Sequence, residues 1–283
     1  MRWKYSKGLQ MRNVYTALVT PFVDNKIDYK SLKKMIEKQN DSEVVGVVAL
    51  GSTGEERLLE EKEKIAILQF VKRYSKKLVI AGICSSSTQF AGKLATKYEL
   101  LGADSLLVCP PPFVGCNQTG LIKHFEMVQN CTNLPIILYN VPHRTGFDID
   151  VATISKIANV CNLWGVKECN DDVAKLGKYQ RENIKLFCGN DSSIDMFEQA
   201  GCNSVISVAS NLCPNVTVKA SNKLLFDKLT SLTSIANPSV IKYALYCAGI
   251  TQSYKVRLPL TTPSRNIRRK IASIVEQYKE VLR

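Results

Sequence analysis

The sequence predicts an α/β fold, a (β/α)8 TIM barrel followed by a C-terminal helical extension. Eight short apolar runs rich in β-branched residues recur along the 283-residue chain, with helix-compatible stretches between them. Near-continuous apolar runs are typical of parallel strands buried on both faces, and eight such strands close a barrel. A chain of this length is also usual for a barrel that forms a single domain.

The predicted strands follow one another at regular spacing. They are residues 16–22, 44–51, 77–84, 103–111, 134–141, 163–169, 184–191 and 204–210. The helices predicted between them include 29–40, 59–75, 88–101, 118–130 and 148–160, where apolar residues stand three and four positions apart. A doubly wound open sheet is the alternative, but no G-x-G-x-x-G fingerprint follows the first run.

The two ends of the chain set the predicted domain limits. Residues 1–10 form a basic extension before Met11, and residues 11–225 are expected to form the barrel. Residues 226–283 are expected to form a helical region packed on the barrel, with helices at 238–249 and 264–282. No low-complexity linker separates a second domain.

Charge and apolar content bear on the possible partners. The chain has 38 basic and 25 acidic residues, a formal net charge of +13, but the basic residues are scattered over the predicted helices. This scatter favours a solvated exterior over a nucleic-acid-binding surface, and an anionic substrate is compatible with the same charge. No segment approaches the roughly 18 consecutive apolar residues of a membrane span.

The ten cysteines occur singly, without a Cys-x-x-Cys pair, so the sequence indicates neither a zinc site nor a redox motif. Several lie in apolar runs, where a free thiol behaves as a small hydrophobe. The first thirty residues contain no signal-peptide core, and a reducing cytoplasm is therefore the expected location.

Polar residues and glycines cluster where the predicted strands end. The clearest groups are Thr20 and Pro21, GSTGE at 51–55, residues 139–146, Lys167, residues 189–191, and Ile206 with Ser207. Active sites of (β/α)8 barrels lie at the carboxyl ends of the strands. The sequence therefore predicts that these residues converge on one rim.

Lys167 is the strongest single indication of catalysis. It stands alone in the apolar run LWGVKEC. Burial of a lysine disfavours its ammonium form and lowers its pKa, and a neutral amine is the form that attacks carbonyl groups. The alternative is a lysine that reaches water or pairs with a carboxylate such as Glu168.

The ordered motifs GSTGE, LYNVPHRTG, GVKE, CGND and VISV resemble those of the dihydrodipicolinate synthase and N-acetylneuraminate lyase superfamily of class I aldolases. The resemblance spans about residues 14–262 and includes NPSVIK at 237–242 and RLPL at 257–260. Within the superfamily, LYNVP-x-RTG is similar to the synthase branch. This branch joins pyruvate to L-aspartate 4-semialdehyde in the diaminopimelate route to lysine.

The resemblance implies a role for each matching residue. Lys167 would form a Schiff base with pyruvate, and Tyr139 would shuttle protons near the imine. Ser52 and Thr53 match a hydroxyl pair that relays protons and binds the pyruvate carboxylate. Arg144 matches the residue that holds the carboxylate of the second substrate. Gly189 and Ile206 match positions whose backbone carbonyls line the site.

The resemblance also implies a homotetramer built from two tight dimers, with closed twofold symmetry also allowing a dimer. It implies no metal or organic cofactor, because the lysine itself supplies the electron sink. Neither a nucleic acid nor a membrane is an expected partner.

Two departures from the family pattern concern regions next to the site. Phe113 stands where the synthases usually place a tyrosine that crosses the dimer interface, and phenylalanine cannot carry a proton. Pro112, Phe90, Ser86 and Glu56 stand where many relatives bind lysine as a feedback inhibitor. These residues predict weak or absent inhibition by L-lysine.

Two alternatives to the synthase remain at this level. One is another superfamily aldolase or lyase, of the N-acetylneuraminate or 2-keto-3-deoxy acid type. Arg144 favours a short, carboxylate-bearing electrophile over such a polyhydroxylated chain. The other is a non-catalytic relative that binds an acidic metabolite or nucleic acid. The presence of all five side chains that match the family argues against it, namely Lys167, Tyr139, Ser52, Thr53 and Arg144.

Overall fold

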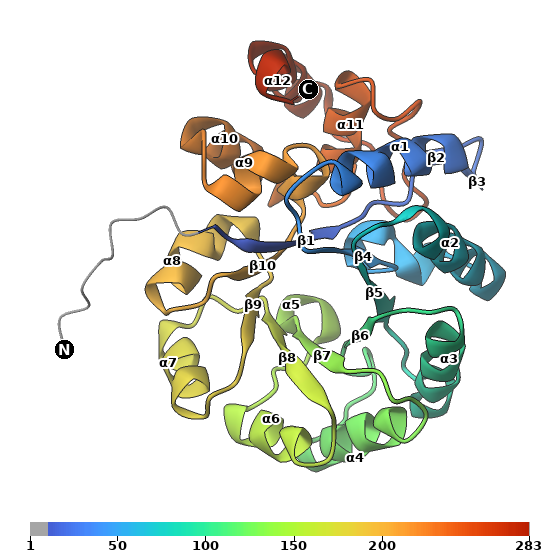
Figure 1. Ribbon diagram of the computed structural model, residues 1–283, viewed down its shortest axis with the longest axis vertical. Coiled ribbons are helices and arrows are strands. Elements are labelled where there is room, and N and C mark those ends of the chain that lie inside the picture. The colour runs from blue at the N-terminus through green and yellow to red at the C-terminus, as the bar shows by residue number, and fades with distance from the viewer. Residues whose placement is uncertain (1–10, 283) are drawn as a thin grey trace.

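A closed barrel of parallel strands forms the centre of the protein (Figure 1). The structure is a computed structural model, and it describes residues 11–282. Within these residues the eight barrel strands are β1 (Asn13–Ala17), β4 (Gly46–Ala49), β5 (Leu78–Ile83), β6 (Ser105–Val108), β7 (Ile136–Asn140), β8 (Leu163–Glu168), β9 (Leu186–Cys188) and β10 (Ser204–Ser207). Their order is β1-β10-β9-β8-β7-β6-β5-β4, and β4 closes on β1. The predicted barrel is confirmed. The extension predicted at residues 1–10 lies outside the described residues.

Helices surround the barrel (Figure 1). They are α1 (Tyr29–Asn40), α2 (Glu61–Tyr74), α3 (Thr88–Leu100), α4 (Gln118–Gln129), α6 (Val151–Ala158), α7 (Val173–Arg181), α8 (Ile194–Gln199) and α9 (Pro214–Lys219). Side-chain caps define several of their starts. Asp28 accepts from the Ser31 amide at 3.0 Å, and Asn117 accepts from the Gly120 amide at 2.8 Å. Each such cap contributes about 1 kcal/mol, because it satisfies an amide that has no partner within the helix.

The first strand differs from its prediction. The sequence run at 16–22 suggested one strand, but β1 ends at Ala17, the last residue that pairs with β4. Residues 22–27 instead form a small hairpin of β2 (Phe22–Val23) and β3 (Lys26–Ile27). Asp24 and Asn25 both have positive φ, the backbone that a two-residue hairpin turn requires.

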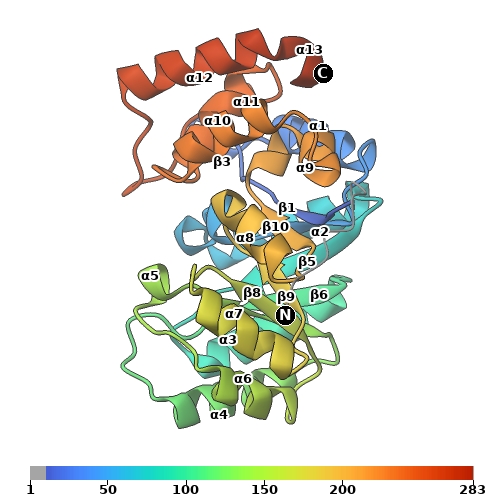
Figure 2. The ribbon, with the colours of Figure 1, turned by 90° about the vertical axis from the view of Figure 1, so that its left-hand side faces the viewer.

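Four further helices follow α9. They are α10 (Lys223–Thr233), α11 (Ser239–Cys247), α12 (Arg265–Gln277) and α13 (Lys279–Leu282). Figures 1 and 2 both place α10, α11 and α12 beside α1 and α9, on one side of the barrel. The proposed domain limit at 225 falls within α10, and the helix predicted at 264–282 divides at Tyr278 into α12 and α13.

The interior of the barrel is packed with side chains. Tyr15, Trp164 and Phe187 come from β1, β8 and β9 and meet edge to face, with ring centroids 5.5 to 5.8 Å apart. Where Gly82 of β5 passes the carbonyl of Leu50, an added Cβ would lie 2.1 Å from that oxygen, so only glycine permits the approach. Lys167 is the register partner of Phe187 and therefore stands at the edge of this packed interior.

Candidate active site

Lys167 and Tyr139 stand side by side on β8 and β7. They are register partners in the parallel ladder, and the Lys167 Nζ lies 4.3 Å from the centroid of the Tyr139 ring. Lys167 is only 5% exposed, and this burial lowers the pKa of its amine. The positive charge of Arg144 lowers the Lys167 pKa further, whereas Cys169 and Asp191 oppose the shift. The result is an amine that loses its proton more readily than an ordinary lysine.

The alternative of an ion pair between Lys167 and Glu168 does not hold. Successive strand residues face opposite sides of the sheet, and the buried Glu168 points away from the barrel interior. Its carboxylate accepts from Asn140 Nδ2 at 2.9 and 3.0 Å and from the Tyr179 hydroxyl at 2.7 Å. Lys175 is its nearest cation, with 3.5 Å between Nζ and Oε2. Glu168 therefore holds the ends of β7 and β8 from outside.

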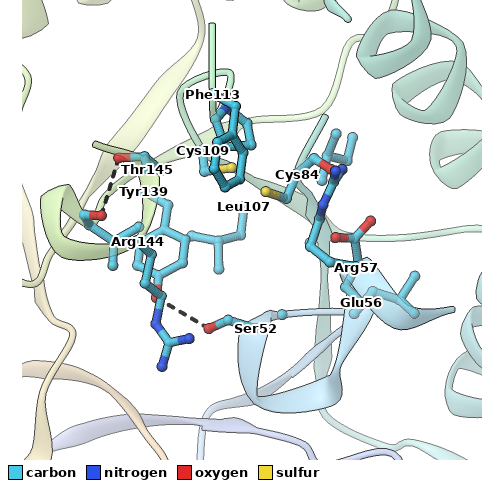
Figure 3. Close-up of a pocket in the computed structure, with 16 residues that line it drawn as sticks. Ser52, Glu56, Arg57, Cys84, Leu107, Cys109, Phe113, Tyr139, Arg144 and Thr145 are labelled. Atoms are coloured by element: carbon cyan, nitrogen blue, oxygen red, sulfur yellow. Dashed lines mark hydrogen bonds between the residues drawn. The ribbon is translucent and has the colours of Figure 1, made fainter. Parts of the chain in front are cut away.

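Tyr139 keeps its phenol proton in this environment. Burial raises the pKa of Tyr139, and the hydrogen bond with Ser52 only partly offsets that shift. The hydroxyl oxygen lies 3.4 Å from Ser52 Oγ, as the dashed line in Figure 3 marks. A protonated phenol next to a hydroxyl can donate a proton and accept one, which is what a relay requires.

Ser52 and Thr53 belong to a short turn after β4, the 3-10 helix η1 (Ser52–Gly54). The turn is anchored by Thr20, whose hydroxyl donates to the Gly54 carbonyl at 2.7 Å. Thr53 is buried, and its hydroxyl accepts from Asn237 Nδ2 at 3.0 Å. Two segments far apart in sequence thus orient the hydroxyl pair.

The C-terminal motifs support the same turn through Glu55. This residue has a left-handed backbone, with φ 57°, and its fully buried carboxylate pairs with Lys242. The other carboxylate oxygen accepts from the Arg257 amide at 2.9 Å. Burial lowers the pKa of Lys242 to about 8 despite the carboxylate beside it. The motifs NPSVIK and RLPL therefore act in the structure by holding GSTGE.

Arg144 lies in the short helix α5 (Pro142–Thr145), which directly follows β7. Its side chain is exposed and lines the open mouth of the site beside Tyr139 and Ser52 (Figure 3). Gly146 ends the helix with a positive φ of 73°, a conformation that glycine adopts without strain. The guanidinium is free to meet an incoming carboxylate.

Gly189 and Ile206 differ in their relation to the site. A Cβ at Gly189 would lie 2.2 Å from Cys169 Sγ and 3.2 Å from Lys167 Cε, so the position has no room for a side chain. Ile206 is 1% exposed and belongs to the apolar interior of the barrel. Val208, two residues further along the chain, lines the same cavity as Lys167.

Asp191 is a site residue to which the sequence assigned no role. It lines the same cavity, and its Oδ2 accepts from the amides of Val208 and Ala209 at 2.9 and 2.7 Å. Burial raises the Asp191 pKa, and hydrogen bonds with Ser207 and with these two amides oppose the shift. The sequence signal that could have identified it is the position of Asp191 in the motif CGND, at the end of a predicted strand.

Two connected spaces surround these residues. A cavity of about 400 Å³ is lined by Lys167, Thr53, Arg144 and Asp191 among others. A narrower one of about 230 Å³ lies between Tyr139, Phe113 and the cysteines 84 and 109 (Figure 3). The first has ample room for a small keto acid next to the lysine.

Phe113, Pro112 and Glu56, three of the residues that depart from the family pattern, line the narrower cavity. Phe113 is 98% exposed and has a φ of 63°, so its ring stands at the surface rather than in the core. At the positions matched to lysine feedback, Glu56 pairs with Lys64, and the Ser86 hydroxyl donates to the Pro112 carbonyl at 2.8 Å. Phe90 is half-buried and packs on the core.

Residues 11–282 contain no group of three or more His, Cys, Asp or Glu side chains arranged to hold a metal ion. They also contain no helix long and apolar enough to span a membrane.

A sequence model described as the dihydrodipicolinate synthetase family matches residues 10–278. Proteins named 4-hydroxy-tetrahydrodipicolinate synthase are similar over most of their length. That of Rickettsia bellii (strain OSU 85-389) is 33% identical, covering 94% of this chain and 98% of the relative. That of Alkaliphilus oremlandii (strain OhILAs) is 35% identical, covering 90% and 93%.

Solved structures give the same picture. The dihydrodipicolinate synthase of Thermotoga maritima superposes with a TM-score of 0.89 at 29% identity, covering 95% of this chain and 99% of that one. The 4-hydroxy-tetrahydrodipicolinate synthase of Methylacidiphilum fumariolicum SolV superposes with a TM-score of 0.88 at 29% identity, covering 96% and 97%.

Proposed function

Because the chain belongs to the dihydrodipicolinate synthetase family, we propose that it catalyses the 4-hydroxy-tetrahydrodipicolinate synthase reaction. In this reaction pyruvate condenses with L-aspartate 4-semialdehyde, a step of diaminopimelate and lysine biosynthesis. One observation carries the proposal: a buried lysine amine of lowered pKa lies 4.3 Å from a tyrosine ring centre and lines an open cavity.

Lys167 would supply the covalent chemistry. Its neutral amine adds to the pyruvate ketone, and loss of water gives an iminium whose nitrogen serves as the electron sink. Loss of a methyl proton then yields an enamine, and its carbon bonds to the aldehyde carbon of the second substrate. Attack by that substrate's amine closes the ring and releases the lysine. Asp191, which lines the same cavity as Lys167, would lie near the positive iminium.

Tyr139 and the hydroxyls of Ser52 and Thr53 would move the protons that these steps require. Tyr139 remains protonated because burial raises its pKa, so it can donate to the hydroxyl that leaves as water. The 3.4 Å separation between its oxygen and Ser52 Oγ allows the proton to be replaced from the turn. The same hydroxyls would bind the pyruvate carboxylate.

Arg144 would select the second substrate. A guanidinium at the cavity mouth binds a carboxylate through two parallel hydrogen bonds, which a short amino acid aldehyde can offer. A polyhydroxylated sugar acid would use such a group less well. The alternative aldolase or lyase reactions of the superfamily share the Lys167 step and differ in this electrophile.

Assembly and location form part of the proposal. No organic cofactor or metal is required, since the lysine provides the electron sink. We infer a homotetramer composed of two tight dimers, supported by the exposed Phe113 ring beside the site. The ten cysteines are all free thiols, as suits a cytoplasmic protein.

The test is to trap the pyruvate imine with borohydride and to locate it by peptide mass spectrometry. Wild-type protein should carry a reduced pyruvyl group on Lys167, and Lys167→Ala should carry none. Lys185→Ala removes another lysine near the barrel and serves as the matched control. Folded wild-type protein without an adduct would contradict the proposal. With an adduct in hand, turnover of L-aspartate 4-semialdehyde against 2-keto-3-deoxy sugar acids identifies the electrophile.

A further inference from the structure

Cys84 and Cys109 follow directly after two paired strands. In the ladder of β5 and β6, Ile83 stands opposite Val108, and the Cys109 amide donates to the Ile83 carbonyl at 3.2 Å. The next residues of both strands therefore project to the same side. Neighbouring strands lie about 4.8 Å apart, which is within the Cα separation of about 4.4 to 6.8 Å that disulfides span.

The two thiols lie next to each other, and each shifts the pKa of the other. Figure 3 shows their sulfur atoms near each other in the narrower cavity, between Phe113 and Arg57. Cys84 is half-buried, whereas Cys109 is 3% exposed. One thiol can therefore meet a small reagent in the cavity, and the other lies behind it.

The surroundings make the two thiols unequal. The neighbouring Cys109 thiol lowers the pKa of Cys84, and the positive charge of Arg57 acts in the same direction, whereas burial and Glu56 oppose the shift. The pKa of Cys109 is raised, first by the Cys84 thiol and then by burial. An accessible thiol of lowered pKa is the usual attacking group in thiol exchange, and its buried neighbour is the usual resolving group.

We propose that Cys84 and Cys109 form a redox-active dithiol that closes to an intramolecular disulfide by exchange with low-molecular-weight disulfides. The Cys84 thiolate attacks one sulfur of the reagent, and the other half leaves and takes up a proton to become a thiol. Cys109 then loses its proton and attacks the Cys84 sulfur, and the second half leaves as a thiol. The cysteines lose two electrons, and the reagent disulfide gains them.

The test uses the full chain and hydroxyethyl disulfide as the probe, followed by alkylation of free thiols and peptide mass spectrometry. Wild-type protein should lose two free thiols and yield a peptide linked through Cys84 and Cys109. Cys109→Ser should retain a hydroxyethyl adduct on Cys84, and in Cys84→Ser the buried Cys109 should stay free. Cys116→Ser, in the same loop region, should form the linked peptide as the wild type does.

Two outcomes would overturn the proposal. One is modification of Cys116 or Cys247 while Cys84 and Cys109 remain free thiols. The other is equal modification of Cys84 and Cys109 as separate mixed disulfides in the wild type. Because the wild-type chain gives the deciding result, a variant that fails to fold leaves the test intact.

An effect on turnover rests in addition on the proposed function. Tyr139 and Arg144 line the same cavity as the two thiols, so a bond between the two sulfur atoms changes the cavity wall beside them and should displace them. Oxidised protein should turn over about 10-fold to 100-fold more slowly, with recovery on reduction and no effect in Cys84→Ser. If reduced protein forms no pyruvyl adduct, the proposed function fails while the disulfide result stands.

Discussion

At the scale of single residues, the site depends on how burial changes ordinary side-chain chemistry. The same removal from water lowers the pKa of the Lys167 amine and raises that of the Tyr139 phenol. Near neutral pH the lysine is thereby moved toward its nucleophilic form and the tyrosine is kept as an acid. Opposite shifts at adjacent register positions give the pair complementary roles.

Tyr139→Phe tests the acid role. The variant retains the ring over Lys167 but loses the hydroxyl, so kcat should fall about 100-fold or more, the usual contribution of a positioned acid or base. Steady-state kinetics with pyruvate and L-aspartate 4-semialdehyde provide the measurement. Tyr98→Phe is the control, because the buried Tyr98 hydroxyl has no hydrogen-bond partner in the described residues. Equal kcat values for the two variants would exclude the role.

At the scale of elements, short turns at the strand ends are held by buried polar contacts from distant parts of the chain. Asn237 reaches Thr53, and Lys242 of α11 reaches Glu55, so the helices after the barrel fix the GSTGE turn. Removal of one partner from a buried ion pair leaves an uncompensated buried charge, so it lowers the free energy of unfolding more than removal of a partner from a surface pair does.

Lys242→Met should lower the free energy of unfolding by about 3 to 5 kcal/mol, because Glu55 would remain buried and charged without its cation. Urea denaturation followed by circular dichroism provides the value. Lys97→Met is the matched control: it removes an exposed pair with Glu61 and should cost less than about 1 kcal/mol. Similar losses in both variants would show that the buried pair has no special part in stability.

His124 of α4 makes stability depend on acid. It is 3% exposed, and burial lowers its pKa from 6.5 to about 4. Between pH 6.5 and about 4 this histidine is protonated in the unfolded chain but neutral in the folded protein. The free energy of unfolding therefore keeps its full value above about pH 6.5 and decreases as the pH falls toward 4. A shift of this size corresponds to about 3 kcal/mol.

His124→Gln should flatten the pH dependence of the unfolding free energy measured by urea denaturation between about pH 6.5 and 4. His143→Gln, which alters the exposed histidine at the site, should leave most of that dependence in place. An unchanged slope in His124→Gln would show that other groups cause it.

At the scale of the whole molecule, the exposed Phe113 ring at the narrower cavity marks the face that we propose lies against a neighbouring chain. Phe113 has a left-handed backbone and almost no contact with its own core, although it follows a buried strand. An aromatic side chain so placed is available to another copy of the chain. Because Phe113 has no hydroxyl, the proposed proton relay would consist of Tyr139, Ser52 and Thr53.

Phe113→Tyr should raise kcat several-fold in the assembled protein, because the added phenol can extend the proton relay. The change has little cost in stability at a 98% exposed position. Val114→Tyr places a phenol on the adjacent residue and serves as the control. A kcat equal to that of wild type, in protein of unchanged oligomeric state by light scattering, would exclude an extended relay.

Inhibition by L-lysine should be weak or absent. The matching positions are already engaged within the chain, since Glu56 pairs with Lys64 and the Ser86 hydroxyl bonds to Pro112. At Glu56 a ligand ammonium would meet the buried Lys64 ammonium, whose like charge repels it. Initial rates over a range of L-lysine concentrations provide the test, with D-lysine as the control. Strong inhibition by L-lysine, at concentrations at which D-lysine has no effect, would contradict the prediction.

Much of the barrel followed from the sequence because its signals are local. Apolar β-branched runs separated by helical periodicity predict parallel strands, and barrel geometry then predicts that Lys167, Tyr139 and GSTGE meet at one rim. The first strand was misplaced because strand pairing, rather than apolar content, determines where β1 ends. The paired thiols were not foreseen, because Cys84 and Cys109 are far apart in sequence and only adjacent strands bring them together.

The sequence by itself determined the strand and helix pattern, the family motifs and the residues at the strand ends. Only the tertiary structure decided that Lys167 is buried over Tyr139, that Glu168 faces away from it, and that Asn237 supports Thr53. The physical reason is that residue types and periodicity are written along the chain. Desolvation and hydrogen bonding between distant segments depend on which surfaces meet when the chain is folded.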